Sequence, residues 1–168
     1  GNATTNLTNN VFTDNGGGLW MFRASPPVYH CPFAASVYFA SSIVNPPQPI
    51  LYNCIIWSET GAARMEHGTS SDRVSLSYSV VQGGYATGTN IVNADPKYFN
   101  QYDADGKDDL FGTADDGLLP DASGSAFNLG TAGEMKDITG ATRTDAPDAG
   151  AYETIVRCPA NQTPKVIY

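Results

Sequence analysis

The chain has 168 residues, which is enough for one domain with a sizeable buried core. Hydrophobic residues make up 41% and charged residues only 15%, with 17 glycines and 11 prolines. This balance favours short strands and turns over helices with charged surfaces. The net charge of −8 excludes nucleic acid as a partner, because nothing here neutralises a row of phosphates. No apolar run is long enough to span a bilayer, so we expect no direct membrane insertion.

Four short segments share one pattern of alternating apolar residues. Their starts are separated by 21, 23 and 25 residues (7 to 28, 28 to 51 and 51 to 76). The segments are residues 7–12, 28–33, 51–56 and 76–81. Alternation predicts that positions one, three and five share a face. The first position is always Leu or Val and the fifth is Val, Pro, Ile and Val, so we expect both columns to point inward.

The third column is polar, with Asn9, His30, Asn53 and Tyr78. We interpret Asn9 and Asn53 as parts of an amide ladder that includes His30. A second apolar stretch follows each of the first three segments, at residues 18–22, 36–39 and 63–65, and predicts a further strand after a turn. One strand per 20–25 residues, stacked in register, predicts an all-β, right-handed parallel β-helix solenoid.

Several motifs resemble bacterial right-handed parallel β-helix proteins of the surface or secreted type, which share the pectin-lyase-like fold. The sequence Asn-Cys-Ile-Ile-Trp at 53–57 is similar to a rung of that family, and residues 77–85 resemble its last rung. Residues 88–96 resemble the exit from the coil. Several later segments, ending with Pro-Asp-Ala-Gly-Ala-Tyr-Glu at 147–153, resemble its C-terminal cap, although Ala-Phe-Asn at 126–128 departs from the cap motif.

The resemblance implies that residues 1–95 are the last coils of a β-helix and that residues 96–153 are an irregular C-terminal cap. Residues 154–168 are then a linker or tail. The family also implies a bacterial protein that is extracellular or on the cell surface. It implies a fold rather than an activity, because enzymes and non-enzymes share this architecture.

An acidic loop in the predicted cap is the strongest candidate for a metal site. Its carboxylates are Asp103, Asp105, Asp108, Asp109, Asp115 and Asp116. These carboxylates repel one another, and the glycines make the loop flexible. Both features favour calcium, which prefers several oxygen ligands. The twelfth position counted from Asp103 is Ala114, where an EF-hand has Glu, so this is not a standard EF-hand. The alternative is a solvated acidic loop without a metal.

Cys31 and Cys54 occupy the same column of neighbouring repeats, which places them within disulfide range. The prediction is a disulfide in an oxidising compartment, with two stacked free thiols as the alternative. Cys158 lies outside the repeats and is predicted to be free or paired with a cysteine of another segment.

Recurrent aromatic residues indicate a contact surface for a glycan or a protein partner. Trp20, Tyr52 and Trp57 are the candidate contact residues. No residue is predicted to be catalytic, because the few carboxylates of residues 6–95 occupy no repeated column.

The sequence therefore predicts a non-enzymatic structural or adhesive module that binds a glycan or a protein. A related prediction is docking on other subunits of a surface assembly. The alternative is a polysaccharide lyase or glycoside hydrolase of the β-helix class, with its catalytic coils upstream of these residues.

Overall fold

The computed structural model describes residues 6–13, 18–22, 26–40, 48–61, 63–68, 74–131 and 133–154. Within these ranges the regular elements are ten short strands in two parallel sheets, so the protein is all-β. Cys158 and the rest of the predicted tail beyond residue 154 lie outside the described residues.

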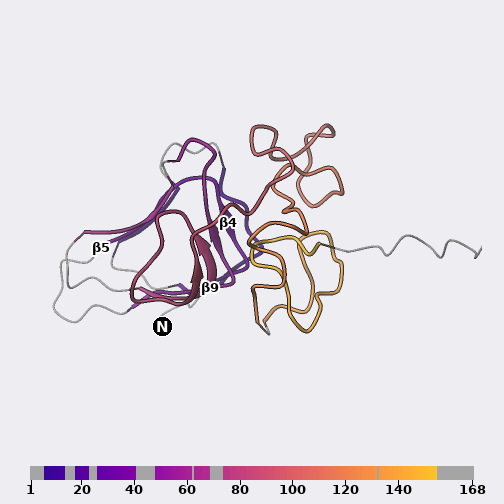
Figure 1. Cartoon of the computed structure of the whole chain (residues 1–168). Helices are drawn as coiled ribbons and strands as arrows, with labels where there is room; N and C mark the ends of the chain where they lie inside the picture. The colour runs from indigo at the N-terminus through magenta and orange to yellow at the C-terminus, as the bar shows by residue number, and fades with distance from the viewer. Residues whose placement is uncertain are drawn as a thin grey trace, which may run out of the picture.

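Seven strands form the larger sheet (Figure 1). They are β1 (Leu7–Thr8), β3 (Val28–Tyr29), β4 (Pro32–Phe33), β6 (Ile50–Tyr52), β7 (Ile55–Ile56), β9 (Ser75–Val81) and β10 (Thr89–Val92). The main path runs β1-β3-β6-β9-β7-β4, and β10 pairs separately with β9. The long strand β9 is shared: β6 pairs with its first half and β7 with its second half.

The register of the repeats agrees with their alignment in the sequence. Leu7 pairs with Val28, Val28 with Leu51, and Leu51 with Leu76, and all these pairs are parallel. The predicted second strands are also present as a three-stranded parallel sheet. It consists of β2 (Leu19–Phe22), β5 (Val37–Ala40) and β8 (Met65–His67). Repetition of strand-forming segments was therefore a sound guide to strand pairing.

The polar third column is a line of bends. Asn9, His30, Asn53 and Tyr78 all have positive φ, between 50° and 53°. Asparagine and histidine tolerate this left-handed conformation better than most residues, whereas Tyr adopts it only where the surroundings impose it. One such residue in each repeat turns the backbone at the same level, and the larger sheet curls there. The amide ladder exists only in part, because Asn53 bonds to His30 whereas Asn9 bonds to the C-terminal region.

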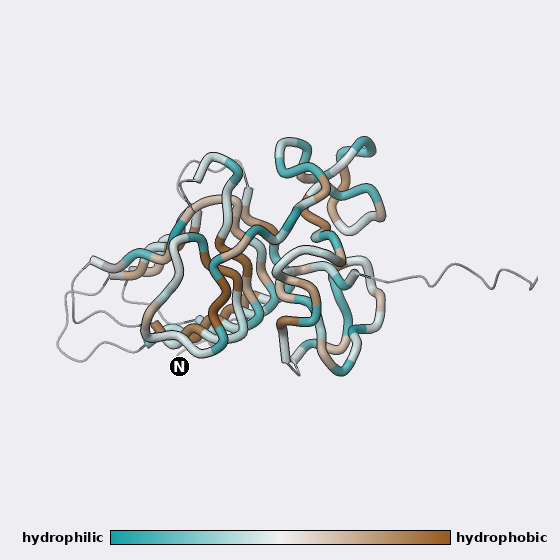
Figure 2. The backbone as a smooth tube through the Cα atoms, viewed as in Figure 1, coloured by the Kyte–Doolittle hydropathy of each residue, from teal (hydrophilic) through white to brown (hydrophobic). Residues whose placement is uncertain are grey.

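The bend also reverses which positions share a face. The first-column residues Val28, Leu51 and Leu76 belong to one buried core. The fifth-column residues Ile55 and Val80 belong to a second core, which they share with the C-terminal region. The prediction that both columns point to one interior was therefore wrong, because a left-handed residue between them breaks the alternation. Figure 2 shows that hydrophobic residues are concentrated along the central strands of the curled sheet.

The predicted right-handed parallel β-helix solenoid with an irregular C-terminal cap is also wrong. The strands form one curled sheet, a half-barrel in which β9 is shared, and a separate small sheet. The bends explain the difference. Each bend joins the two short strands of one repeat, such as β3 and β4, and both strands belong to the same sheet.

Residues 96–154 do not simply close the end of a stack. They lie along the flank of the curled sheet and contact early as well as late repeats (Figure 1). Asn9 Nδ2 donates to the carbonyl of Lys136, and Gly150 N donates to the carbonyl of Asn53. This lateral position brings C-terminal residues next to the faces of strands β3 and β6.

Candidate functional site

Three tyrosines from neighbouring strands form a ladder on the larger sheet. Tyr29 on β3 and Tyr52 on β6 are register partners, and Tyr78 lies at the bend of β9. The ring centroids of Tyr29 and Tyr52 are 6.1 Å apart, and those of Tyr52 and Tyr78 are 5.8 Å apart. Val28 and Leu51 precede the first two tyrosines and are fully buried, so alternation turns Tyr29 and Tyr52 away from that core.

A groove of about 400 Å³ opens beside the first two tyrosines. Tyr29, Ile50 and Tyr52 line it from the sheet, and Gly133 and Glu134 line it from the C-terminal region. All three tyrosines are partly exposed, and Ile50 is 44% exposed. We call this surface the tyrosine groove. It offers two aromatic rings, one aliphatic side chain and one carboxylate, a combination that suits a ligand with both apolar and polar faces.

The three predicted contact residues do not form one surface. Tyr52 lies in the tyrosine groove, whereas Trp20 lies on β2 in the small sheet. Trp20 is 69% exposed, and its ring lies 4.5 Å from that of Tyr38 with a tilt of 36°. Trp57 is partly buried against the second core. Sequence reasoning missed Tyr29 as a partner of Tyr52, although the column alignment of the two residues was the available signal.

The acidic loop is folded largely by its own side chains and backbone. Asp116 is fully buried and accepts hydrogen bonds from Gly112 N, Thr113 N and the hydroxyl of Tyr152, the last at 2.6 Å. Burial and the Asp116 carboxylate raise the pKa of Tyr152. Asp116 is therefore a structural acceptor that joins the loop to the second core.

The other aspartates of the loop are more exposed. Asp115 accepts from the hydroxyl of Thr113 at 2.8 Å and from Lys107 N at 2.9 Å, and these bonds lower its pKa. Asp108 accepts from Leu110 N, two residues further on, as in an Asx turn. Among the residues that the structure describes, no group of three or more His, Cys, Asp or Glu side chains is arranged to hold a metal. Asp103, Asp105 and Asp109 are thus not gathered with the others around one point.

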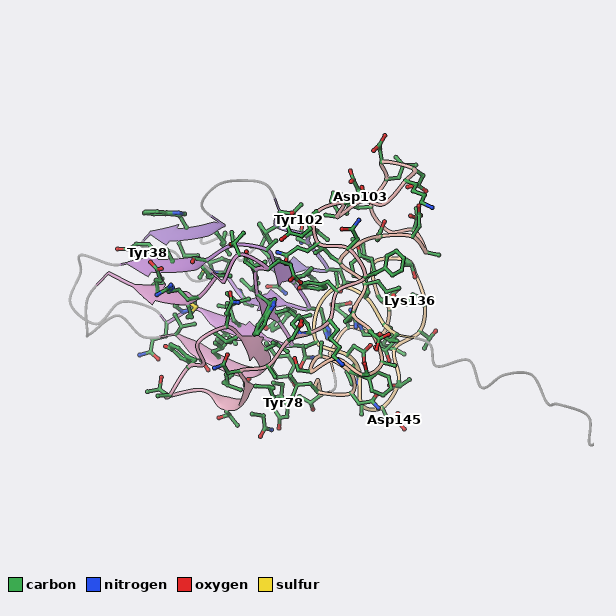
Figure 3. The ribbon with its side chains drawn as sticks, turned by 45° about the horizontal axis from the view of Figure 1, so that its top comes forward. Tyr38, Tyr78, Tyr102, Asp103, Lys136 and Asp145 are labelled. Atoms are coloured by element: carbon green, nitrogen blue, oxygen red, sulfur yellow. The ribbon has the colours of Figure 1, made fainter. Side chains whose placement is uncertain are left out.

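A second groove, of about 360 Å³, lies within this loop. Phe99, Asp103, Lys107 and Asp115 are among the residues that line it. Figure 3 shows Asp103 and the neighbouring Tyr102 far from Tyr78. The acidic loop and the tyrosine ladder are therefore separate surfaces.

Cys31 and Cys54 are both buried, and both thiols are free in this structure. Cys31 donates to the carbonyl of Tyr29 and Cys54 to the carbonyl of Tyr52. Burial raises the pKa of both thiols, that of Cys54 to about 11, so neither is a reactive thiolate. Both side chains lie inside the first core.

A buried charged network was not predicted from the sequence. The guanidinium of Arg143 donates to the carbonyls of Gly150 and Ala151 at 2.9 Å and pairs with the carboxylate of Glu153 at 3.4 Å. Both charged side chains are almost fully buried. Burial lowers the pKa of Arg143, and Glu153 and two aspartates oppose that shift. Arg143 also donates to Asn9 Oδ1, so it ties the C-terminal region to the first repeat.

His30 and Asn53 connect this network to the bends of the sheet. Asn53 Nδ2 lies 2.9 Å from His30 Nε2, and the Asn53 amide exchanges hydrogen bonds with the backbone of Thr131. Burial, together with the nearby charge of Arg143, lowers the pKa of His30 to about 3. His30 is therefore neutral at physiological pH. Its position in the column was noted in the sequence, but its contact with the C-terminal region was not predicted.

No known protein family, curated protein or solved structure matches this chain. In the described part of the chain, no helix is long and apolar enough to cross a membrane.

Proposed function

We propose that this chain is a non-enzymatic binding module of a secreted or cell-surface protein and that its ligand is a glycan. The tyrosine groove carries the proposal. Sugar rings have apolar C–H faces and polar edges, and aromatic rings on a stable sheet provide matching stacking surfaces. Tyr29 and Tyr52 are held by neighbouring paired strands, so little conformational freedom is lost when a ligand binds.

The charged groups of the groove favour binding over hydrolysis. A glycoside hydrolase normally places two carboxyl groups on either side of the scissile bond. Among the described residues that line the tyrosine groove, Glu134 is the single carboxylate. This supports a binding module over the glycoside hydrolase alternative. A protein partner or another subunit of a surface assembly is the competing ligand, and a binding experiment separates these cases.

The test compares glycan binding by the wild-type protein with binding by Tyr52→Ala. We expect the variant to bind about tenfold more weakly, because it loses one stacking ring. Tyr38→Ala is the matched control, since Tyr38 is a partly exposed tyrosine on the small sheet that stacks on Trp20. Calorimetry with a panel of neutral, acidic and amino oligosaccharides gives the affinities. If no oligosaccharide binds, or if Tyr38→Ala weakens binding as much as Tyr52→Ala, the proposal is wrong.

We further propose that calcium binds the acidic loop between Asp103 and Asp116. The support is the density of carboxylates, of which Asp103, Asp108 and Asp109 remain at least partly exposed. Because these groups are not gathered in this structure, binding requires a local rearrangement of the loop. We expect calcium to raise the melting temperature of chelator-treated protein, measured by scanning calorimetry. An unchanged melting temperature at millimolar calcium contradicts the proposal.

A further inference from the structure

The tyrosine groove has the geometry of a site for a cationic group. The rings of Tyr29 and Tyr52 stand at 90° to each other, with centroids 6.1 Å apart. In such a T-shaped pair, the faces of the edge-on ring are not covered by the other ring. Aromatic faces attract ammonium groups by cation–π interaction, which is worth about 0.5–1 kcal/mol at exposed sites. An uncovered aromatic face in a groove that also contains a carboxylate therefore favours a cation over a neutral hydroxyl.

Glu134 adds a negative charge to the same groove. Its side chain is exposed, and it is absent from the two ion pairs found in the described part of the chain, Arg64–Glu66 and Arg143–Glu153. The neighbouring ammonium of Lys136 donates to the carbonyl of Gly140. The carboxylate of Glu134 is thus available to an external cation. The net charge of −8 adds a long-range attraction for cations and repels anionic glycans.

We infer that the ligand of the tyrosine groove is a polysaccharide with free amino groups. This inference rests on the proposed glycan-binding function and specifies its ligand class. A protonated amino sugar combines the two features that the groove recognises. Its ring C–H face stacks on Tyr52 or Tyr29, and its ammonium lies between the tyrosine faces and the carboxylate of Glu134. N-acetylation removes the positive charge and leaves the rest of the sugar ring unchanged.

The experiment uses two ligands that differ only at the sugar nitrogen, which is a charged ammonium in one and a neutral acetamide in the other. Oligomers of glucosamine and of N-acetylglucosamine, equal in length, are titrated into the whole chain near pH 6, where sugar amines are protonated. We expect the glucosamine oligomer to bind about tenfold more tightly, from one cation–π contact and one exposed charge pair. In Glu134→Gln this preference should fall several-fold, whereas the affinity for the acetylated oligomer should stay the same. Glu59→Gln is the matched control, because Glu59 is also exposed but lies outside the groove.

The possible outcomes separate this inference from the proposed function. Equal affinity for the two oligomers, with both weakened in Tyr52→Ala, overturns the inference and leaves glycan binding in place. Binding of neither oligomer or of any other glycan overturns both. If the glucosamine oligomer binds equally well to wild type, Glu134→Gln and Tyr52→Ala, it is attracted by overall charge, and the inference is wrong. A preference that is lost in Glu134→Gln and kept in Glu59→Gln supports it.

Discussion

The two main regions of the molecule are held together by different kinds of interaction. In residues 7–92, parallel strand pairs align apolar columns around the first core. In the described residues 96–154, the regular pairing consists of two isolated bridges, Tyr98–Pro120 and Lys136–Thr142. The C-terminal region also contains every buried Asp, Glu, Arg and Lys side chain of the described chain. The first region is thus organised by parallel strand pairs in register, whereas the second combines individual polar contacts with the second core.

Aspartates fold much of the C-terminal region through short turns. Asp95, Asp108, Asp121 and Asp137 each accept a hydrogen bond from the backbone N–H two residues further on. This contact stabilises a turn without a regular strand or helix. This use of aspartates shows that acidic residues in this protein serve backbone geometry as well as charge. It also explains how residues 96–154 form a compact flank with little secondary structure.

The largest effect should come from breaking the buried network with Arg143→Met. This change leaves Glu153 as a buried carboxylate without its partner, and such a loss typically costs about 3–5 kcal/mol. The matched control is Arg64→Met, because Arg64 pairs with Glu66 while its side chain is 61% exposed. That control should lose at most about 1 kcal/mol. Urea denaturation measures both, and equal losses would show that the Arg143 network does not hold the C-terminal region.

The next effect should come from the apolar contact between the two regions. Ile55 on β7 is fully buried and packs in the second core, and a Cβ added to Gly150 would lie only 2.8 Å from Ile55 Cδ1. Ile55→Ala should therefore destabilise the protein by about 2–4 kcal/mol. Ile50→Ala is the control, since Ile50 is on the same sheet but is 44% exposed. Thermal unfolding of both variants tests this, and a control as unstable as Ile55→Ala would contradict the packing described here.

A pH-dependent effect should come from His30. Its pKa is lowered to about 3 in the folded protein, whereas an unfolded histidine titrates near 6.5. The unfolded chain therefore binds more protons between these values, and the contribution of neutral His30 is lost as the pH falls from about 6.5 towards 3. The expected slope is at most about 1.4 kcal/mol per pH unit.

The measurement for His30 is the free energy of unfolding at several pH values for wild type and His30→Asn. Asparagine is chosen because Asn9 and Asn53 adopt the same left-handed conformation in neighbouring repeats. The difference between the two proteins removes the contribution of the carboxylates that titrate in both. A difference that does not change with pH would show that His30 is not a buried neutral group.

Strand pairing was predictable because equivalent positions in successive repeats pair with each other in the sheet. Leu51 and Leu76 occupy equivalent positions in the sequence and are register partners in the sheet. The bends were harder to predict, because Asn9 and Asn53 suit both an amide ladder and a left-handed turn. The positive φ of Tyr78 is imposed by the neighbouring strands and is not a preference of tyrosine. Because the third column was interpreted as a ladder and not as a turn, the predicted strand pairs were correct but the predicted fold class was wrong.

The candidate site was predictable only in part, for a similar reason. Tyr52 was identified from alternation within its own strand, and Tyr29 follows from the repeat register. Glu134 reaches the groove because the C-terminal region lies along the flank of the sheet, and no local pattern encodes that position. The contact of Arg143 with Asn9 spans 134 residues and depends on the complete fold.

The most direct test of the binding surface is an NMR titration that follows the aromatic side chains. Oligosaccharide is added to the protein while the ring resonances of the tyrosines and the indole resonance of Trp20 are recorded. We predict progressive shifts at Tyr29 and Tyr52, with little change at Trp20 or at Tyr102 of the acidic loop. Shifts confined to Trp20 or Tyr102, with Tyr29 and Tyr52 unchanged, would contradict the assignment of the tyrosine groove as the binding site.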